Sequence, residues 1–254
     1  MLATDFETLS ALLVTMNDRQ IGRRFGVTGR TIGNWRRSLC LSPSTLPNIG
    51  SQKYQLNRSF FRSIDTPDKA YVLGFIIADG AIHRSGKTVT IAVKPSDVKI
   101  LESIQRSAGS TAPVHTRLVT QGFDNRPHHL ALIHLSSKAI VSDLAHLGVH
   151  PAKSSNATFP SIPPHLESHL VRGLFDGDGY IGRRLFELVG SSPLLEGVRE
   201  CVYRHTDCQL VRRTNNNHPS LFGYRRDRSA LIWIYESATL ALERKLDSYH
   251  RYWA

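Results

Sequence analysis

The chain has 254 residues, which at roughly 100–200 residues per domain allows one large domain or two to three small ones. Apolar residues make up 41% of it and charged residues 21%, a balance that excludes a disordered chain. The 32 Lys and Arg outnumber the 21 Asp and Glu, and the formal charge of +11 favours a polyanionic partner. No stretch of about 18 apolar residues is present, so we expect no membrane contact.

Neither a disulfide-bonded nor a secreted protein is expected, to judge from the cysteines and the N-terminal residues. Cys40, Cys201 and Cys208 are an odd number without a Cys-x2-Cys pair, so we expect buried, reduced thiols. We recognise no metal-ligand spacing among the twelve histidines and assign them no role. The start MLATDFETLS has no signal or transit peptide pattern, which predicts an intracellular protein, cytoplasmic or nucleoid-associated.

Residues 1–40 are expected to form a small all-α helix-turn-helix domain. Asn17 is a candidate helix N-cap, and a second helix is expected after the Gly-Val-Thr-Gly break at 26–29. The expected core of this domain is Ile21, Phe25, Val27, Ile32 and Trp35. The residues expected to contact DNA near the recognition helix are Thr28, Arg30, Thr31, Asn34 and Arg37. The alternative is a basic helical hairpin that serves packing or protein contact.

Residues 41–66 are rich in Ser, Pro, Asn and Gln, and we expect an extended linker there. Residues 67–160 and 161–254 then form an internal repeat. PDKAYVLGFIIADGAI in the first copy matches PHLESHLVRGLFDGDGYI in the second, with Asp79 and Asp178 at equivalent positions. We therefore predict an α+β fold of two like-folded repeats related by a pseudo-two-fold axis, within a monomer.

The order of elements is expected to be α-β-β-α-β-β-α in each repeat. After the first Asp-Gly, alternation and helical spacing predict a strand, a helix, a hairpin and a helix, over 88–93, 96–109, 114–120 with 128–136, and 137–148. The corresponding segments of the second copy are 185–190, 192–205, 208–214, 220–225 and a C-terminal helical stretch.

The helices that open the two repeats carry small residues four positions apart. Gly74 with Ala78, and Gly173 with Gly177, make flat stripes on which the two helices can approach closely. Each helix is followed by a glycine, Gly80 or Gly179, which we expect in the left-handed conformation that closes a helix. If the stripes pack together, Asp79 and Asp178 come side by side at one end.

Two neighbouring carboxylates at helix C-termini repel each other and face the negative ends of the helix dipoles. A divalent cation relieves both effects, and Mg²⁺ prefers oxygen ligands and bridges to phosphates. The pattern therefore predicts two or more Mg²⁺ ions and phosphodiester hydrolysis, with Asp79 and Asp178 as metal ligands. The alternative is that each Asp-Gly pair is ordinary turn chemistry.

VLGFIIADG (72–80) and VRGLFDGDG (171–179) resemble the LAGLIDADG motif of homing endonucleases, in the single-chain, two-repeat form. The resemblance covers about residues 65–254 and implies a saddle of two antiparallel sheets over DNA, with the motif helices at its centre. It implies that the backbone carbonyls of Ala78 and Gly177 are further metal ligands, and that the products are staggered double-strand breaks.

The family also uses a basic residue near each active site, which implies a catalytic role for Lys153 and Lys245, with Lys138 as a rival in the first repeat. The sixth motif position departs from the family pattern in one copy, because Ile77 stands where the second copy has Asp176.

The sheets of such a saddle should present basic residues to DNA. The candidates in the two repeats are Lys94, Arg117, Arg183, Arg184, Arg212, Arg213 and Arg225. The resulting prediction is a site-specific, metal-dependent endonuclease that acts on double-stranded DNA. Two alternatives remain open on the same fold: a DNA-binding regulator that does not cleave, and an intron RNA maturase.

Overall fold

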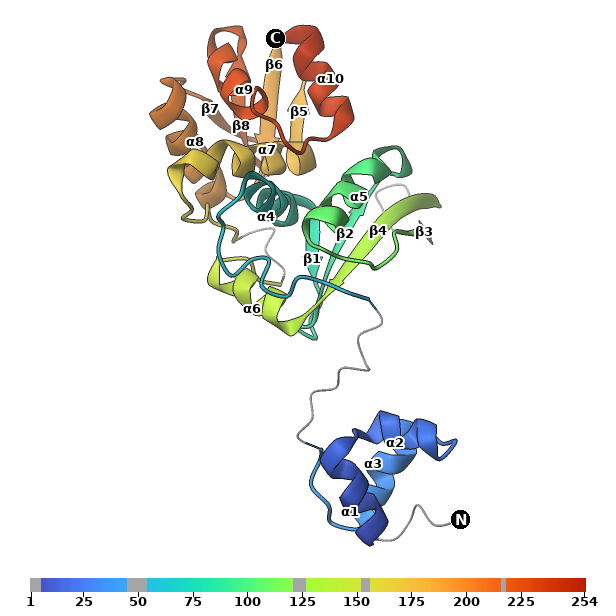
Figure 1. Cartoon of the computed structure of the whole chain (residues 1–254). Helices are drawn as coiled ribbons and strands as arrows, with labels where there is room; N and C mark the ends of the chain where they lie inside the picture. The colour runs from blue at the N-terminus through green and yellow to red at the C-terminus, as the bar shows by residue number, and fades with distance from the viewer. Residues whose placement is uncertain (1–5, 45–53, 121–126, 152–155, 216–217) are drawn as a thin grey trace. The chain divides into compact units, whose positions relative to one another are not determined.

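The computed structural model describes residues 6–44, 54–120, 127–151, 156–215 and 218–254. The chain divides into two compact units, Met1–Tyr54 and Gln55–Ala254, drawn in Figure 1. Within the described residues, no helix combines the length and apolarity needed to cross a membrane.

The described residues of the first unit form three short helices, α1 (Phe6–Thr15), α2 (Asp18–Arg24) and α3 (Gly29–Ser38). Asn17 caps α2 as predicted: its side chain accepts hydrogen bonds from the backbone of Arg19 and Gln20, and the Gln20 side chain returns one to Asn17. The two reciprocal bonds form a capping box, which satisfies N–H groups that the first helical turn leaves without partners.

The core of the first unit differs from the prediction at Phe25. Leu9, Leu13, Ile21 and Ile32 are buried, and Val27 and Trp35 pack against them. Phe25, predicted as a core residue, is 36% exposed. The prediction was wrong because Phe25 ends α2, where the chain turns at Gly26 with a φ of +69° and leaves the helical periodicity.

The predicted linker over 41–66 is too long at its C-terminal end. Residues from Gln55 onward belong to the second unit, and Phe60, Phe61 and Ile64 are buried in its core. The aromatic pair at 60–61 packs edge to face, with ring centroids 4.8 Å apart. The linker was predicted from the polar residues around these three apolar side chains. The three side chains instead pack into the core of the second unit just before the first repeat begins.

The second unit contains the two repeats in the predicted order. The first consists of α4 (Pro67–Asp79), β1 (Gly80–Ile82), β2 (Thr88–Val93), α5 (Val98–Ser107), β3 (His115–Val119), β4 (His128–Ser136) and α6 (Lys138–His146). The second consists of α7 (Glu167–Asp178), β5 (Gly179–Ile181), β6 (Leu185–Val189), α8 (Ser192–Thr206), β7 (Val211–Asn215), β8 (His218–Tyr224), α9 (Arg228–Tyr235) and α10 (Glu243–Tyr252).

Each repeat builds a four-stranded antiparallel sheet with the same topology, β1-β2-β4-β3 in the first and β5-β6-β8-β7 in the second. Alternation along β2 buries Val89, Ile91 and Val93 against the helices and turns the intervening residues outward. The motif helices α4 and α7 lie side by side at the centre of the unit (Figure 1). The α+β fold of two equivalent repeats is thus confirmed.

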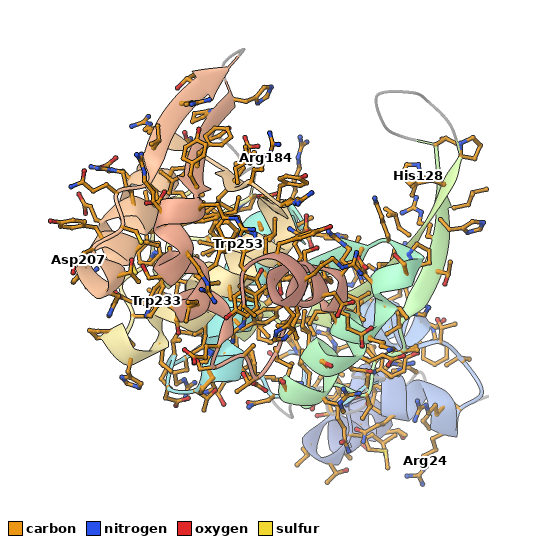
Figure 2. The ribbon with its side chains drawn as sticks, turned by 90° about the horizontal axis from the view of Figure 1, so that it is seen from above. Arg24, His128, Arg184, Asp207, Trp233 and Trp253 are labelled. Carbon is orange, nitrogen blue, oxygen red and sulfur yellow. The ribbon has the colours of Figure 1, made fainter. Side chains whose placement is uncertain are left out.

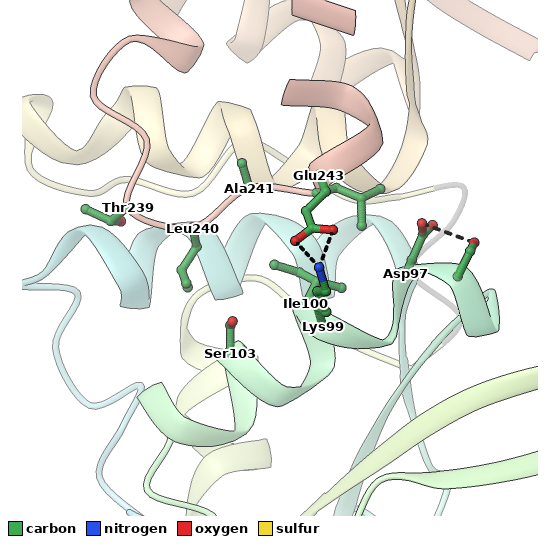
Figure 3. Close-up of a pocket in the computed structure, with 10 residues that line it drawn as sticks. Asp97, Lys99, Ile100, Ser103, Thr239, Leu240, Ala241 and Glu243 are labelled. Carbon is green, nitrogen blue, oxygen red and sulfur yellow. Dashed lines mark hydrogen bonds and ion pairs between the residues drawn. The ribbon is translucent and has the colours of Figure 1, made fainter. Parts of the chain in front are cut away.

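The C-terminal segment ties the second repeat to the first. Glu243 and Arg244, which open α10, pair with Lys99 and Asp97 beside α5, at 2.9 Å and 3.0 Å. Asp97, Lys99 and Glu243 border a small pocket between α5 and residues 239–243, in which Figure 3 shows the Lys99–Glu243 pair. The Lys99 pair is exposed and contributes little, while the side chain of Asp97 is only 9% exposed and is better shielded from solvent.

Candidate metal site and DNA interface

The contact between α4 and α7 depends on glycine at two equivalent positions. A Cβ atom on Gly74 would lie 2.1 Å from the carbonyl oxygen of Leu170, and one on Gly173 would lie 2.1 Å from that of Tyr71. Ordinary van der Waals contact begins at about 3.4 Å, so only glycine permits this approach of the two backbones. Farther along, a Cβ on Gly177 would meet the methyl group of Ala78 at 2.3 Å. These four residues are those predicted for the helix interface.

Asp79 and Asp178 end the two packed helices, and both are exposed, whereas the residues before them in each helix are mostly buried. A Cβ on Gly177 would lie 3.3 Å from Oδ2 of Asp79, so the Asp79 carboxylate reaches across to the end of α7. The two predicted metal-binding aspartates therefore lie at the same end of the helix pair. Ala78 and Gly177, whose carbonyls were expected to assist, are half-buried beside them.

The glycines after these aspartates do not adopt the predicted left-handed conformation. Gly80 has φ −77° and ψ 141°, and Gly179 has φ −96° and ψ 167°, so both are extended and begin strands β1 and β5. The prediction was wrong because each helix continues directly into a strand. Glycine is needed for space instead: a Cβ would lie 2.6 Å from the carbonyl of Ile76 or 2.5 Å from that of Phe175.

Lys245 lies beneath the carboxylate pair, where its side chain is buried. Its ammonium group donates hydrogen bonds to the carbonyls of Phe175, at 2.6 Å, and Gly179. Burial lowers the pKa of Lys245 to about 8, although Asp176, Asp79 and Asp178 all favour its charged form. Lys245 thus binds the last turn of α7. Lys153, predicted as its counterpart, lies outside the described residues.

Asp176, the sixth motif residue of the second repeat, is fully buried in a polar network. Its carboxylate accepts hydrogen bonds from the hydroxyls of Tyr71 at 2.7 Å and Tyr235 at 2.8 Å, and from the backbone N–H of Leu242 at 2.6 Å. Burial raises the pKa of Asp176, against the effect of these three donors. The network links α4, α7, α9 and the segment before α10, a positioning role for which Ile77 offers no equivalent.

Arg172 extends this network along α7. It is fully buried and donates to the carbonyls of Leu240 at 2.7 Å and Ile234 at 2.8 Å, and to Nδ1 of His169 at 2.6 Å. Burial, together with the Arg172 charge, lowers the pKa of His169 to about 4, so His169 is neutral at physiological pH. The sequence motif gave no indication of the two carbonyl partners, because Ile234 and Leu240 lie 62 and 68 residues away along the chain.

The outward faces of the two sheets can be compared residue by residue through their registers. In the first sheet, Thr90 pairs with His134 and with Ala81. In the second, Glu187 occupies the position of Thr90 and pairs with Phe222 and Tyr180. Positions related by the pseudo-two-fold axis therefore carry different chemical groups.

The outward face of the first sheet carries a row of imidazoles. Thr90 Oγ1 lies 2.9 Å from Nε2 of His83 and 2.8 Å from Nδ1 of His134, and the ring of His115 lies 6.3 Å from that of His134. Burial and the neighbouring His83 and His115 lower the pKa of His134. Arg117, predicted to contact DNA, is exposed on the same strand as His115 and two residues from it, so it shares this face.

The two adjacent arginines of β7 point in opposite directions. Arg213 is exposed on the outward face, where its guanidinium lies 5.1 Å from the ring centroid of Phe222 and donates to the Tyr224 hydroxyl at 2.8 Å. Arg212 pairs in register with buried Leu221 and lies 4.0 Å from Glu196 of α8. The structure thus separates Arg212 from the predicted DNA-facing set, because successive residues of a strand alternate between faces.

The remaining basic candidates of the second unit are exposed. Lys94 follows β2, and Arg183 with Arg184 forms the tight turn between β5 and β6. Arg225 is held by the C-terminus: it donates to the carbonyl of Tyr252 and stacks 5.0 Å from the ring of Trp253. In Figure 2 the two sheets extend to opposite sides of the central helices, with Arg184 beside one and His128 on the other.

In the first unit, the predicted DNA contacts lie at and along α3. Thr28 caps the helix, with Oγ1 accepting from the N–H of Thr31, and the two hydroxyls lie 2.9 Å apart. Arg30, Asn34 and Arg37 are exposed. Arg37 donates to Asn34 at 2.6 Å, so these two side chains form one polar group on the helix surface.

The second unit has the two-repeat LAGLIDADG fold, and solved structures that share it include homing endonucleases. The homing endonuclease I-WcaI bound to its DNA recognition sequence has a TM-score of 0.54 and 13% identity, over 74% of this chain and 91% of that one. I-DmoI in complex with DNA and Ca has a TM-score of 0.50 and 14% identity, over 77% and 99%. Meganuclease I-SmaMI bound to uncleaveable DNA has a TM-score of 0.50 and 12% identity, over 72% and 88%.

At the level of sequence, no protein-family model matches the chain, and no curated protein does. The similarity therefore rests on the fold and on the two motif helices.

Proposed function

We propose that this chain is a site-specific DNA endonuclease that uses divalent cations bound by Asp79 and Asp178 to make staggered double-strand breaks. The observation that carries the proposal is the pairing of these exposed carboxylates at one end of two helices packed in backbone contact. The fold shared with DNA-bound homing endonucleases supports it.

The donor set fits Mg²⁺, because carboxylate and backbone carbonyl oxygens are hard ligands. The bound ions would polarise the phosphodiester and lower the pKa of the attacking water. Without a metal, two carboxylates facing a phosphate would only repel it, so a protein that merely binds DNA gains nothing from them. This argument favours cleavage over the regulator hypothesis.

Lys245 acts in this proposal as a positioning residue. Its ammonium is bonded to two carbonyls of the last turn of α7 and is buried, so it fixes the helix end that carries Asp178. Its positive charge also offsets the repulsion expected between Asp79 and Asp178, since Lys245 interacts electrostatically with both.

DNA contact is assigned to the outward faces of both sheets and to α3. Imidazole, hydroxyl and guanidinium groups on these faces are hydrogen-bonding partners for base edges and phosphates. The second unit presents Arg117 and Arg213 from equivalent edge strands, and the first unit presents Arg30 from α3. Two separate units that each bind DNA would lengthen the recognised site.

The test is cleavage of a long-DNA library, with the ends mapped, in Mg²⁺ and separately in EDTA. The Asp79→Asn/Asp178→Asn protein runs alongside, and Asp247→Asn, which removes an exposed carboxylate of α10, is the matched control. We expect recurrent staggered breaks at one sequence with the wild type and with Asp247→Asn. They should be absent from the EDTA reaction and from the double variant.

Two other outcomes would change the assignment. Salt-sensitive, sequence-selective DNA binding without breaks would identify a regulator on an endonuclease fold. Absence of both, with selective binding to a structured intron RNA, would identify a maturase.

A further inference from the structure

The second repeat holds a group of metal-ligating side chains at the end of α7 opposite to Asp178. Glu167 opens α7, and Cys201 and His205 lie four residues apart on α8. One ligand atom of each lies within 4.8 Å of the others. Residues at i and i+4 share a helix face, so the Cys-x3-His spacing presents both groups to the same carboxylate. Our assumption that no histidine shows metal-ligand spacing was therefore wrong at His205.

Two donors converge on a single oxygen of Glu167. The Cys201 thiol donates to Oε2 at 3.3 Å and Nε2 of His205 donates to the same atom at 2.7 Å. With zinc–ligand bonds of about 2.0–2.3 Å, tetrahedral ligand atoms lie roughly 3.3–3.7 Å apart. The sulfur–oxygen distance already has this value, and the imidazole needs to move outward by less than about 1 Å.

The surroundings of the group fix its orientation. The Glu167 side chain is 7% exposed, and its other oxygen accepts from Arg204 at 3.4 Å. The His205 ring stacks on Trp233 of α9, with centroids 4.8 Å apart and planes 17° from parallel. Such outer partners orient metal ligands and hold them ready to bind. The His205 side chain is 25% exposed, which leaves a route to solvent.

We propose that Glu167, Cys201 and His205 form a binding site for a tetrahedral transition-metal ion of the Zn²⁺ type, separate from the Asp79–Asp178 site. Thiolate and imidazole donors favour such an ion over Mg²⁺, and three protein ligands leave the fourth position to water. On binding, the Cys201 thiol releases its proton to solvent, and Nε2 of His205 gives up its proton, which passes to solvent from a charged ring or reappears on Nδ1 in a neutral one. The two hydrogen bonds to Oε2 are thereby replaced by metal–ligand bonds.

The metal site proposed at Glu167, Cys201 and His205 has a structural role. Glu167 and Asp178 are separated by the length of α7, about 16 Å at 1.5 Å per residue, so this ion does not reach the reacting phosphate. It would join α7 to α8 and hold the outer end of the motif helix. The proposal does not depend on whether the chain cleaves DNA.

Co²⁺ is the probe, because a thiolate ligand gives it a charge-transfer absorption band that a site made only of oxygen ligands lacks. The full-length, chelator-treated chain should develop this band and saturate at one thiolate-bound Co²⁺ per chain. Cys201→Ser should abolish the band, and His205→Gln should weaken Co²⁺ binding at least tenfold. The matched controls Cys40→Ser and Cys208→Ser, and the Asp79→Asn/Asp178→Asn protein, should retain it.

A wild-type chain without the band, or a band that survives in Cys201→Ser, would overturn the proposal. If Cys201→Ser does not fold, His205→Gln decides: undiminished affinity in that variant refutes the site. Zn²⁺ should also raise the Tm of the wild type and leave that of His205→Gln unchanged.

Discussion

Replacing Gly173 by alanine tests whether backbone contact between α4 and α7 holds the second unit together. The added Cβ would lie 2.1 Å from the carbonyl oxygen of Tyr71 and 2.7 Å from the backbone nitrogen of Phe75. Neither atom belongs to a side chain that can rotate away. To restore ordinary contact, the helices must separate locally by about 1.3 Å, which opens gaps in a close-packed core.

The expected cost follows from two opposed effects. Overpacking of a core costs about 1–3 kcal/mol, and the contact with backbone puts this site at or above the upper end. Alanine recovers about 1 kcal/mol through its higher helix propensity. We expect a net loss of about 2–3 kcal/mol in the free energy of unfolding, which for a unit of this size lowers its Tm by roughly 5–10 °C.

Differential scanning calorimetry of the full chain measures this change. The matched control is Gly33→Ala in α3, where the nearest atom to the new Cβ is a carboxylate oxygen of Asp18 at 3.2 Å, on a side chain that can move. That variant should be neutral or more stable in the first unit. If Gly173→Ala melts within about 2 °C of the wild type, the close approach of the helices does not carry the stability we assign to it.

Three further predictions concern the polar groups. Asp176→Asn should destabilise the second unit by about 2–4 kcal/mol in urea unfolding, because an amide nitrogen replaces an acceptor that faces buried donors; a double-mutant cycle with Tyr235→Phe should show coupling above 0.5 kcal/mol. The pKa of His169, about 4 when folded against 6.5 unfolded, means that protons favour the unfolded chain. The free energy of unfolding should therefore fall by up to about 3 kcal/mol between pH 6.5 and pH 4, and His169→Gln should flatten this dependence. Because the pKa of His134 is lowered from its ordinary value of 6.5, His134 gains its charge only below that pH, and DNA affinity in filter binding should rise there. His134→Gln should weaken this rise; no difference between the two proteins would remove that face from the interface.

The fold was predictable because the signal occurs twice. The two motif segments and the matching order of strands and helices predict the repeat, the α+β class and the central helix pair. Gly74 and Gly173 determine the packing of the central helix pair. They can be identified from the sequence because only glycine permits contact between two helix backbones. Asp79 and Asp178 follow from the same segments.

What the sequence did not predict depends on tertiary placement. Arg212 was grouped with Arg213 as part of one basic cluster. Alternation along a strand places the two on opposite faces, but the pairing with β8 determines which of them faces outward. The burial of Lys245 depends on how α10 folds back against α7. The cluster of Glu167 with Cys201 and His205 had a signal in its Cys-x3-His spacing, but the third ligand comes from a different helix.

The two outward sheet faces share one backbone frame but differ in side chains, with Thr90 and His134 of one corresponding to Glu187 and Phe222 of the other. In a dimer of identical subunits, every substitution would appear twice, and its effects on both half-sites would be inseparable. Here the duplicated halves are one covalent chain, so each can accumulate changes alone. A DNA-binding surface built this way can change toward recognition of an asymmetric sequence one half at a time, while the shared helix pair keeps Asp79 and Asp178 in place.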